Sequence, residues 1–87
     1  MEPTVELDVR GLEHPEPLER SVEVLKNMQR NDLFKLVIHR MPQPLLMIAD
    51  RHGIGYLVCE KETDEWHIWF SKEKGVLNST LCGGMDV

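Results

Sequence analysis

Residues 7–18 have the sequence LDVRGLEHPEPL, which holds the strongest structural signal in the chain. Apolar and charged residues alternate from Val5 to Arg10, as they do in a strand with one buried face. Gly11 breaks this alternation. Pro15 then predicts the start of a helix, because proline is favoured at the first helical position, where its missing N–H is not needed. The stretch therefore predicts a strand, a glycine turn and a helix in immediate succession.

Apolar residues at helical spacing continue from this start. They form one stripe that predicts the buried face of the helix: Leu18, Val22, Leu25 and Met28. The helix is expected to end at Asn31-Asp32. A second Pro-x-Pro-Leu step at Pro42 predicts a shorter helix from about Pro44 to a stop at Gly53. The residues of this helix that are expected to face inward are Leu45, Ile48 and Ala49.

Three more segments have the composition of strands. They cover residues 34–39, 54–61 and 65–71, with a polar connection between the last two. In the last strand one face is predicted to carry Trp66, Ile68 and Phe70, and the other His67 and Trp69. The element order is thus β-α-β-α-β-β. Right-handed crossovers then make the first two strands parallel and place both helices on one face of the sheet.

The size and charge of the chain restrict its class. The 87 residues suffice for one small domain, which we expect to span residues 1–72, followed by a mobile tail over residues 73–87. With 10 basic and 15 acidic residues the net charge is −5, which disfavours nucleic acid as a direct partner. The sequence shows no apolar run of membrane-spanning length and no leader peptide. We therefore expect a soluble cytoplasmic protein without membrane contact. The sequence does not define its oligomeric state.

Residues 7–17 closely resemble the signature of the TusA/SirA family of small bacterial sulfur carriers, L-D-x-R-G-L-x-C-P-x-P. The resemblance covers about residues 4–71. It implies an α+β fold, a two-layer sandwich with a mixed four-stranded sheet and both helices on one face. In that family the cysteine before the first proline carries a persulfide sulfur, whereas this chain has His14 there. An imidazole cannot hold a sulfane sulfur, so the resemblance implies the fold without the chemistry of the family.

A second stretch strengthens the resemblance. Residues 36–45, which end in HRMPQPL, look like the H-x-P-x-P-L stretch of a cysteine-less relative of TusA. That relative is a conserved bacterial family of unknown function, and it shares the R-G-L-E-x-P-E-P opening. The chain is more similar to this branch than to the sulfur carriers.

Two histidines mark a candidate binding site. His14 and His39 follow strands that are expected to be parallel, so both lie at the sheet edge where α/β proteins usually bind ligands. Our leading hypothesis is a non-enzymatic module that binds a protein or a small ligand at this edge. The alternative is that His14 is a surface imidazole that fills the space of the cysteine. The other residues assigned to the site are Arg10, Glu13, Glu16 and Arg40, and the glutamates favour a basic patch on a protein partner.

Trp69 is a second candidate contact residue, on the sheet face away from the helices. Aromatic side chains are enriched at the energetically important positions of interfaces. The alternative is that the tail or a second copy of the chain covers this tryptophan.

The two cysteines support a different function. Cys59 is expected to be a buried small residue within a strand, and Cys82 an exposed thiol with no cationic neighbour in the sequence. Their spacing indicates neither a disulfide framework nor a zinc ribbon. A sulfur carrier that uses Cys82 or Cys59, in tRNA thiolation or sulfur metabolism, is the alternative function that the family resemblance implies.

A third hypothesis is a metal or haem site formed by His14, His39 and His67. No pair of histidines has the local spacing of a metal motif, so no metal or other cofactor is assigned. Nucleophile motifs, phosphate-binding glycine loops and paired carboxylates on one helix face are also absent from the sequence. We therefore assign no catalytic residue and lean against enzymatic activity.

Overall fold

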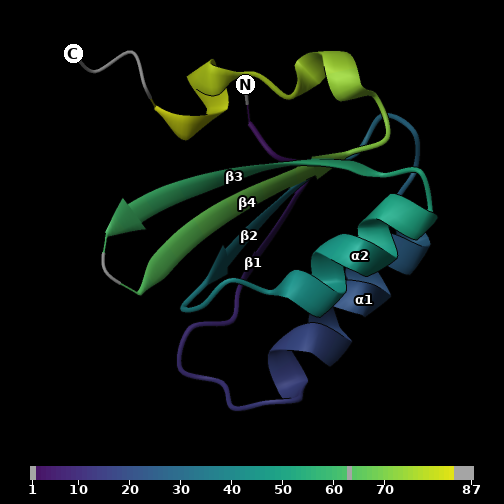
Figure 1. Cartoon of the computed structure of the whole chain (residues 1–87). Helices are drawn as coiled ribbons and strands as arrows, with labels where there is room; N and C mark the ends of the chain where they lie inside the picture. Colours follow the sequence, from purple (N-terminus) through teal and green to yellow (C-terminus); the bar gives the residue numbers. More distant parts are fainter. Residues whose placement is uncertain (1, 63, 84–87) are drawn as a thin grey trace.

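The computed structural model describes residues 2–62 and 64–83 of the chain (Figure 1). Two helices and four strands follow the predicted order β-α-β-α-β-β, and two short 3-10 helices come after them. The elements are β1 (Val5–Asp8), α1 (Glu16–Asn27), β2 (Leu33–Ile38), α2 (Gln43–Arg51), β3 (Gly55–Glu62), β4 (Glu65–Ser71), η1 (Lys74–Val76) and η2 (Ser79–Cys82). No helix of these residues is long and apolar enough to cross a bilayer.

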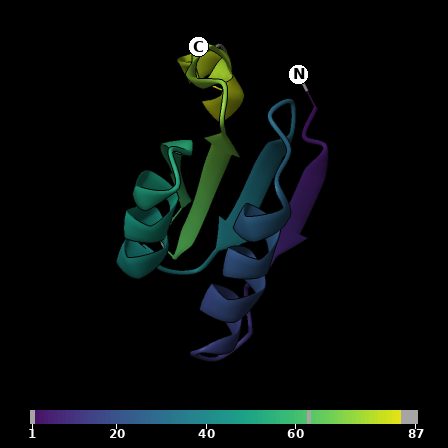
Figure 2. The ribbon, with the colours of Figure 1, turned by 90° about the vertical axis from the view of Figure 1, so that its right-hand side faces the viewer.

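The sheet is mixed, as predicted. Its strand order is β1-β2-β4-β3, with β1 and β2 parallel and β4 antiparallel to both of its neighbours. The two helices lie side by side on one face of the sheet (Figures 1 and 2). The predicted α+β two-layer architecture is therefore confirmed.

The core lies between the sheet and the helices. Phe34 of β2 and Phe70 of β4 are fully buried, with ring centroids 5.2 Å apart. The helices supply Leu25, Leu45 and Ala49, each at most 3% exposed. Full burial of a large apolar side chain stabilises the fold by about 1.5–3 kcal/mol. The predicted apolar stripe and the inward residues of the second helix all belong to this core or pack against it.

The ends of α1 differ from the prediction. The helix begins at Glu16, and Pro15 is the capping residue before it. It ends at Asn27, earlier than the predicted Asn31-Asp32. The reason is Met28, which takes an extended backbone conformation and has a side chain that is only 4% exposed. The connection to β2 is then closed by Asp32, whose carboxylate accepts a hydrogen bond from the backbone N–H of Gln29 at 2.8 Å.

The C-terminal segment packs on the sheet face opposite the helices (Figure 1). We call residues 74–83 the C-terminal cap. Cys82 of the cap forms a disulfide with Cys59 of β3, with the two Cα atoms 5.5 Å apart. The expectation of two free cysteines was therefore wrong. Their spacing in the sequence did not indicate a disulfide, and the fold brings the two cysteines together across 23 residues. The predicted mobile tail includes this cap up to Gly83, and its remainder, residues 84–87, lies outside the described residues.

Candidate functional site

The two Pro-x-Pro-Leu steps meet at one edge of the sheet. Because β1 and β2 are parallel, the chain leaves both strands at the same edge and enters α1 and α2 from there. Gly11, with φ of +90°, allows the turn after β1, since that conformation is strained for other residues. The connections before the two helices therefore lie next to each other, as the sequence indicates.

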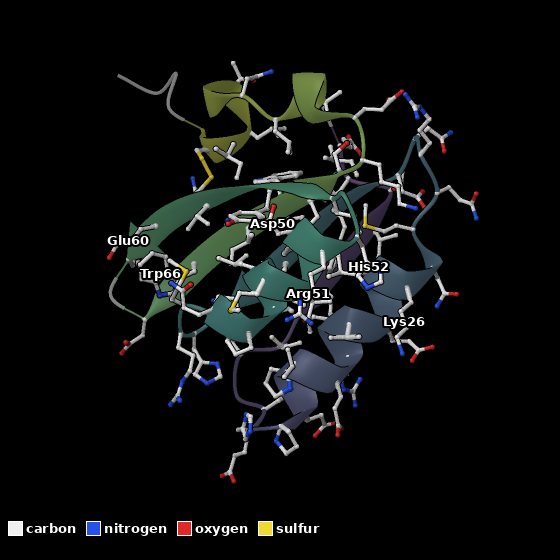
Figure 3. All side chains as sticks on the ribbon, turned by 45° about the vertical axis from the view of Figure 1, so that its right-hand side comes forward. Lys26, Asp50, Arg51, His52, Glu60 and Trp66 are labelled. Carbon is white, nitrogen blue, oxygen red and sulfur yellow. A yellow bond between two sulfur atoms is a disulfide. The ribbon has the colours of Figure 1, made fainter. Side chains whose placement is uncertain are left out.

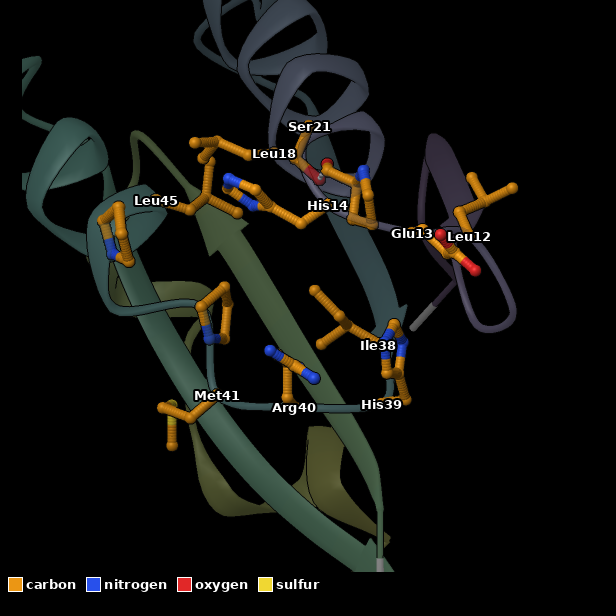
Figure 4. Close-up of a pocket in the computed structure, with 13 residues that line it drawn as sticks. Leu12, Glu13, His14, Leu18, Ser21, Ile38, His39, Arg40, Met41 and Leu45 are labelled. Atoms are coloured by element: carbon orange, nitrogen blue, oxygen red, sulfur yellow. Dashed lines mark hydrogen bonds between the residues drawn. The ribbon is translucent and has the colours of Figure 1, made fainter.

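A cavity of about 430 Å³ opens between these two connections (Figure 4). This volume is in the range of small-molecule sites. Side chains from the start of α1, the end of β2 and the start of α2 surround it (Figure 4). Most of the lining is apolar, from Leu12, Pro17, Leu18, Ile38, Met41, Pro42, Pro44 and Leu45.

The polar groups of the cavity come from both connections and from α1. They are Glu13 and His14 before α1, Ser21 within it, and His39 and Arg40 after β2. His14 is exposed, whereas His39 is half-buried. Ser21 is fully buried, and its hydroxyl donates to the carbonyl of Pro17 at 2.7 Å. The cavity thus combines apolar walls with a few polar groups, as small-molecule sites generally do.

The imidazole of His39 has one unusual feature. Its Nδ1 is buried, and no described residue forms a hydrogen bond with it. A buried polar atom without a partner is unfavourable, and such atoms are rare in folded proteins. The unpartnered nitrogen belongs to a residue that lines the cavity, so it is the first group to examine for ligand recognition.

Arg10 and Glu16, which were also assigned to the site, do not line the cavity. Glu16 accepts hydrogen bonds from Arg20, one turn further along α1. Arg10 binds the Asp8 carboxylate with two nitrogens, at 3.0 and 2.8 Å, and lies 3.3 Å from Glu65. The hydrogen bond from Arg10 lowers the pKa of Asp8, and Asp8 in turn raises the pKa of Arg10.

His67 lies on the other face of the sheet from the cavity. It stands opposite Val37 and Cys59 in the strand register, and its Nε2 is 2.8 Å from Glu65. The structure therefore brings His14 and His39 to one cavity but places His67 elsewhere. Among the described residues, no three His, Cys, Asp or Glu side chains are grouped so that they could hold a metal ion.

Trp69 is 5% exposed and lies in an apolar cluster with residues of the C-terminal cap. The sequence left Trp69 either as a contact residue or as a residue covered by the tail or a second copy. The structure shows that the C-terminal cap covers it. Lys35 lies over its ring, with Nζ 5.5 Å from the centroid. The loops that precede the two helices and the covered face of Trp69 are thus on opposite sides of the sheet.

Sequence reasoning missed two parts of these surfaces. The apolar wall from Met41, Pro42 and Leu45 had one available signal, because the repeated Pro-x-Pro-Leu step places two similar connections at one edge. The surroundings of Cys82 had none. Lys61 of β3 donates a hydrogen bond to the carbonyl of Cys82, so a cation lies beside this cysteine in space although none neighbours it in the sequence.

These features define a small α+β domain with a ligand-sized cavity at the edge where both helices begin. Residues 6–72 match the family described as "Uncharacterized conserved protein (DUF2249)". The chain belongs to this family. Among curated proteins and among solved structures, no match to the chain was found.

Proposed function

We propose that this protein is a non-enzymatic binding module that holds a small molecule in the cavity between the two helix-start connections. One observation carries the proposal: His14, His39 and Arg40, from separate parts of the chain, line a single ligand-sized cavity. The unpartnered Nδ1 of His39 supports the proposal. A bound ligand would supply the missing hydrogen bond once the imidazole ring turns toward it.

The lining indicates the chemistry of the ligand. Apolar side chains form most of the wall and favour an apolar body. Arg40 is exposed at the cavity, and no described residue forms an ion pair with it. The guanidinium is therefore available for a carboxylate or another planar anion. We infer that the ligand has an apolar body and an anionic head.

The resemblance to TusA/SirA proteins is consistent with this function. We propose that the chain is a bacterial, cytoplasmic relative of the sulfur carriers that keeps their strand-turn-helix frame and has exchanged the sulfur-bearing cysteine for His14. In this proposal the residue before the first proline still contacts a ligand, but it no longer carries sulfur. A protein partner with a basic patch would meet the same edge through Glu13, which is exposed, and Glu16, which is half-buried and paired with Arg20.

The test is an NMR screen of the labelled protein with a panel of aliphatic and aromatic carboxylic acids. We expect one class of these acids to shift the amide signals around the cavity in a saturable way. His39→Phe keeps a ring in the cavity but removes its nitrogens. Loss of a hydrogen bond to the ligand should weaken binding by about tenfold, which corresponds to about 1.4 kcal/mol.

The matched control is His52→Ala, which removes an exposed histidine from the C-terminal end of α2, outside the cavity. This variant should bind the acids as the unchanged protein does. Saturable binding that His39→Phe and Arg40→Gln leave intact would contradict the proposed site. Sulfur carriage by Cys82 or Cys59, the alternative function, requires that the disulfide between them is reduced first.

A further inference from the structure

The C-terminal cap covers a second apolar cluster, separate from the main core. Leu33, Cys59 and Trp69 of the sheet are buried in it, each at most 5% exposed. The cap and the adjoining strand contribute partly buried residues that pack against them: Leu57, Val76, Leu77, Leu81 and Cys82. Without the cap, the sheet would present this apolar face to solvent.

The disulfide attaches the cap to this face (Figure 3). Cys59 lies within β3 and is 4% exposed, while Cys82 is at the end of η2 and half-buried. The two positions are 23 residues apart in the sequence. The bond therefore joins the last turn of the cap to β3, an edge strand of the sheet, and the cap packs over Trp69.

The noncovalent contacts between the cap and the sheet are weaker than the disulfide. Nε1 of Trp69 is buried, and no described residue accepts a hydrogen bond from it. A buried donor without an acceptor loses the hydrogen bonds that water would provide, which is unfavourable. The apolar contacts of Val76, Leu77 and Leu81 oppose this loss, but all three residues remain partly exposed. The covalent bond is consequently the strongest connection between the cap and the sheet.

We propose that the Cys59–Cys82 disulfide is a redox-exchangeable latch, opened by a protein dithiol, which controls access to the sheet face around Trp69. A thiolate of the dithiol attacks Sγ of Cys82, the more exposed of the two residues. The S–S bond breaks, and its electron pair leaves on Sγ of Cys59, which takes up a proton. The second thiol of the reductant then attacks the mixed disulfide and releases Cys82. Two electrons and two protons pass to the protein, and the dithiol becomes a disulfide.

Lys61 is placed to assist the second step. Its ammonium group donates a hydrogen bond to the carbonyl of Cys82, which brings a positive charge to the residue that leaves as a thiolate. Cationic neighbours favour the thiolate form of cysteine. We expect Lys61→Met to slow reduction several-fold without changing the packing of the cap. Lys26→Met, which removes an exposed lysine from α1 on the other side of the sheet, is the control and should leave the rate unchanged.

The decisive experiment uses Trp66→Phe, which leaves Trp69 as the only tryptophan. Acrylamide quenching of its fluorescence is compared before and after reduction by a purified dithiol protein of the thioredoxin type, without denaturant. The latch predicts that quenching increases several-fold on reduction, while the far-UV circular dichroism of the sheet and helices is retained. The same variant with Cys59→Ala and Cys82→Ala should be quenched like the reduced protein, with or without reductant.

Three results would overturn the inference. The first is a disulfide that the dithiol protein does not reduce in the native protein. The second is complete reduction, shown by two free thiols, with quenching of Trp69 unchanged. The third is global unfolding on reduction, since the bond would then be a structural staple and not a latch. None of these results depends on the cavity, so they leave the proposed function untouched.

Discussion

Two single polar atoms are unusual in this molecule, one on each side of the sheet. Nδ1 of His39, on the side of the helices, and Nε1 of Trp69, on the side of the cap, are both buried without a hydrogen-bond partner among the described residues. Each such atom reduces stability by about 1–3 kcal/mol relative to a satisfied one. Both atoms lie at surfaces for which we propose a change of state, ligand binding in one case and opening of the cap in the other.

Asp8 provides a test at the residue scale. The hydrogen bond from the Arg10 side chain lowers the pKa of Asp8 in the folded protein. A carboxyl group with a lowered folded pKa stabilises the fold above its unfolded pKa, and this contribution disappears as the pH falls through the folded value. In Arg10→Gln, we expect the Asp8 pKa, measured by carboxyl NMR, to rise toward that of an ordinary aspartate.

The pH dependence of the free energy of unfolding should change in the direction that this pKa shift predicts. Between the unfolded and the folded pKa of Asp8, Arg10→Gln should lose less stability on acidification than the unchanged protein. Arg20→Gln is the control, because Arg20 pairs with Glu16 on α1 and not with Asp8. A pKa of Asp8 that stays low in Arg10→Gln would show that the hydrogen bond is not its cause.

At the scale of elements, β3 and the cap are joined by a covalent bond that the other elements lack. A disulfide restricts the unfolded chain, and the effect grows with the length of the closed loop. For a separation of 23 residues, we expect the double substitution Cys59→Ala and Cys82→Ala to lower the free energy of unfolding by about 3 kcal/mol. Urea unfolding followed by circular dichroism measures this difference.

The comparison with reduced protein supplies the control. The unchanged chain in the presence of reductant should have nearly the stability of the double variant, and added reductant should not affect the variant itself. If the two proteins are equally stable under oxidising conditions, the cysteines are not joined in solution.

On the scale of the whole molecule, the sheet separates two apolar clusters. The buried residues of the main cluster lie between Val9 and Phe70 and include both helices, whereas the second depends on the cap. The family match over residues 6–72 likewise ends before the cap. The sequence-based prediction that residues 1–72 form an independent domain can be tested by truncation.

A chain truncated after residue 72, with Cys59→Ala to avoid a free thiol, should therefore still fold. We expect a cooperative thermal transition at a lower temperature than that of the whole chain. The uncovered face around Leu33 and Trp69 should also promote self-association, because large exposed apolar patches are sites of protein contact. Circular dichroism and analytical ultracentrifugation measure the two effects. A truncated chain without a cooperative transition would show that the cap is part of the folding unit.

The sequence by itself determined the order of the elements, the parallel pairing of β1 and β2 and the helix-covered face of the sheet. These depend on local periodicity, on the glycine and proline positions and on the handedness of crossovers, all of which are visible in the chain. It also placed His14 and His39 at one edge, because parallel strands end at the same edge.

Only the tertiary structure decided what surrounds these residues. The cavity depends on how the side chains of two connections leave a space between them, and the disulfide depends on where a weakly patterned segment crosses the sheet. The ion pairs of Arg10 and the hydrogen bond of Lys61 likewise join residues that no periodicity relates. Contacts between distant segments are set by the packing of the whole chain, and a pattern of neighbours along the sequence does not contain them.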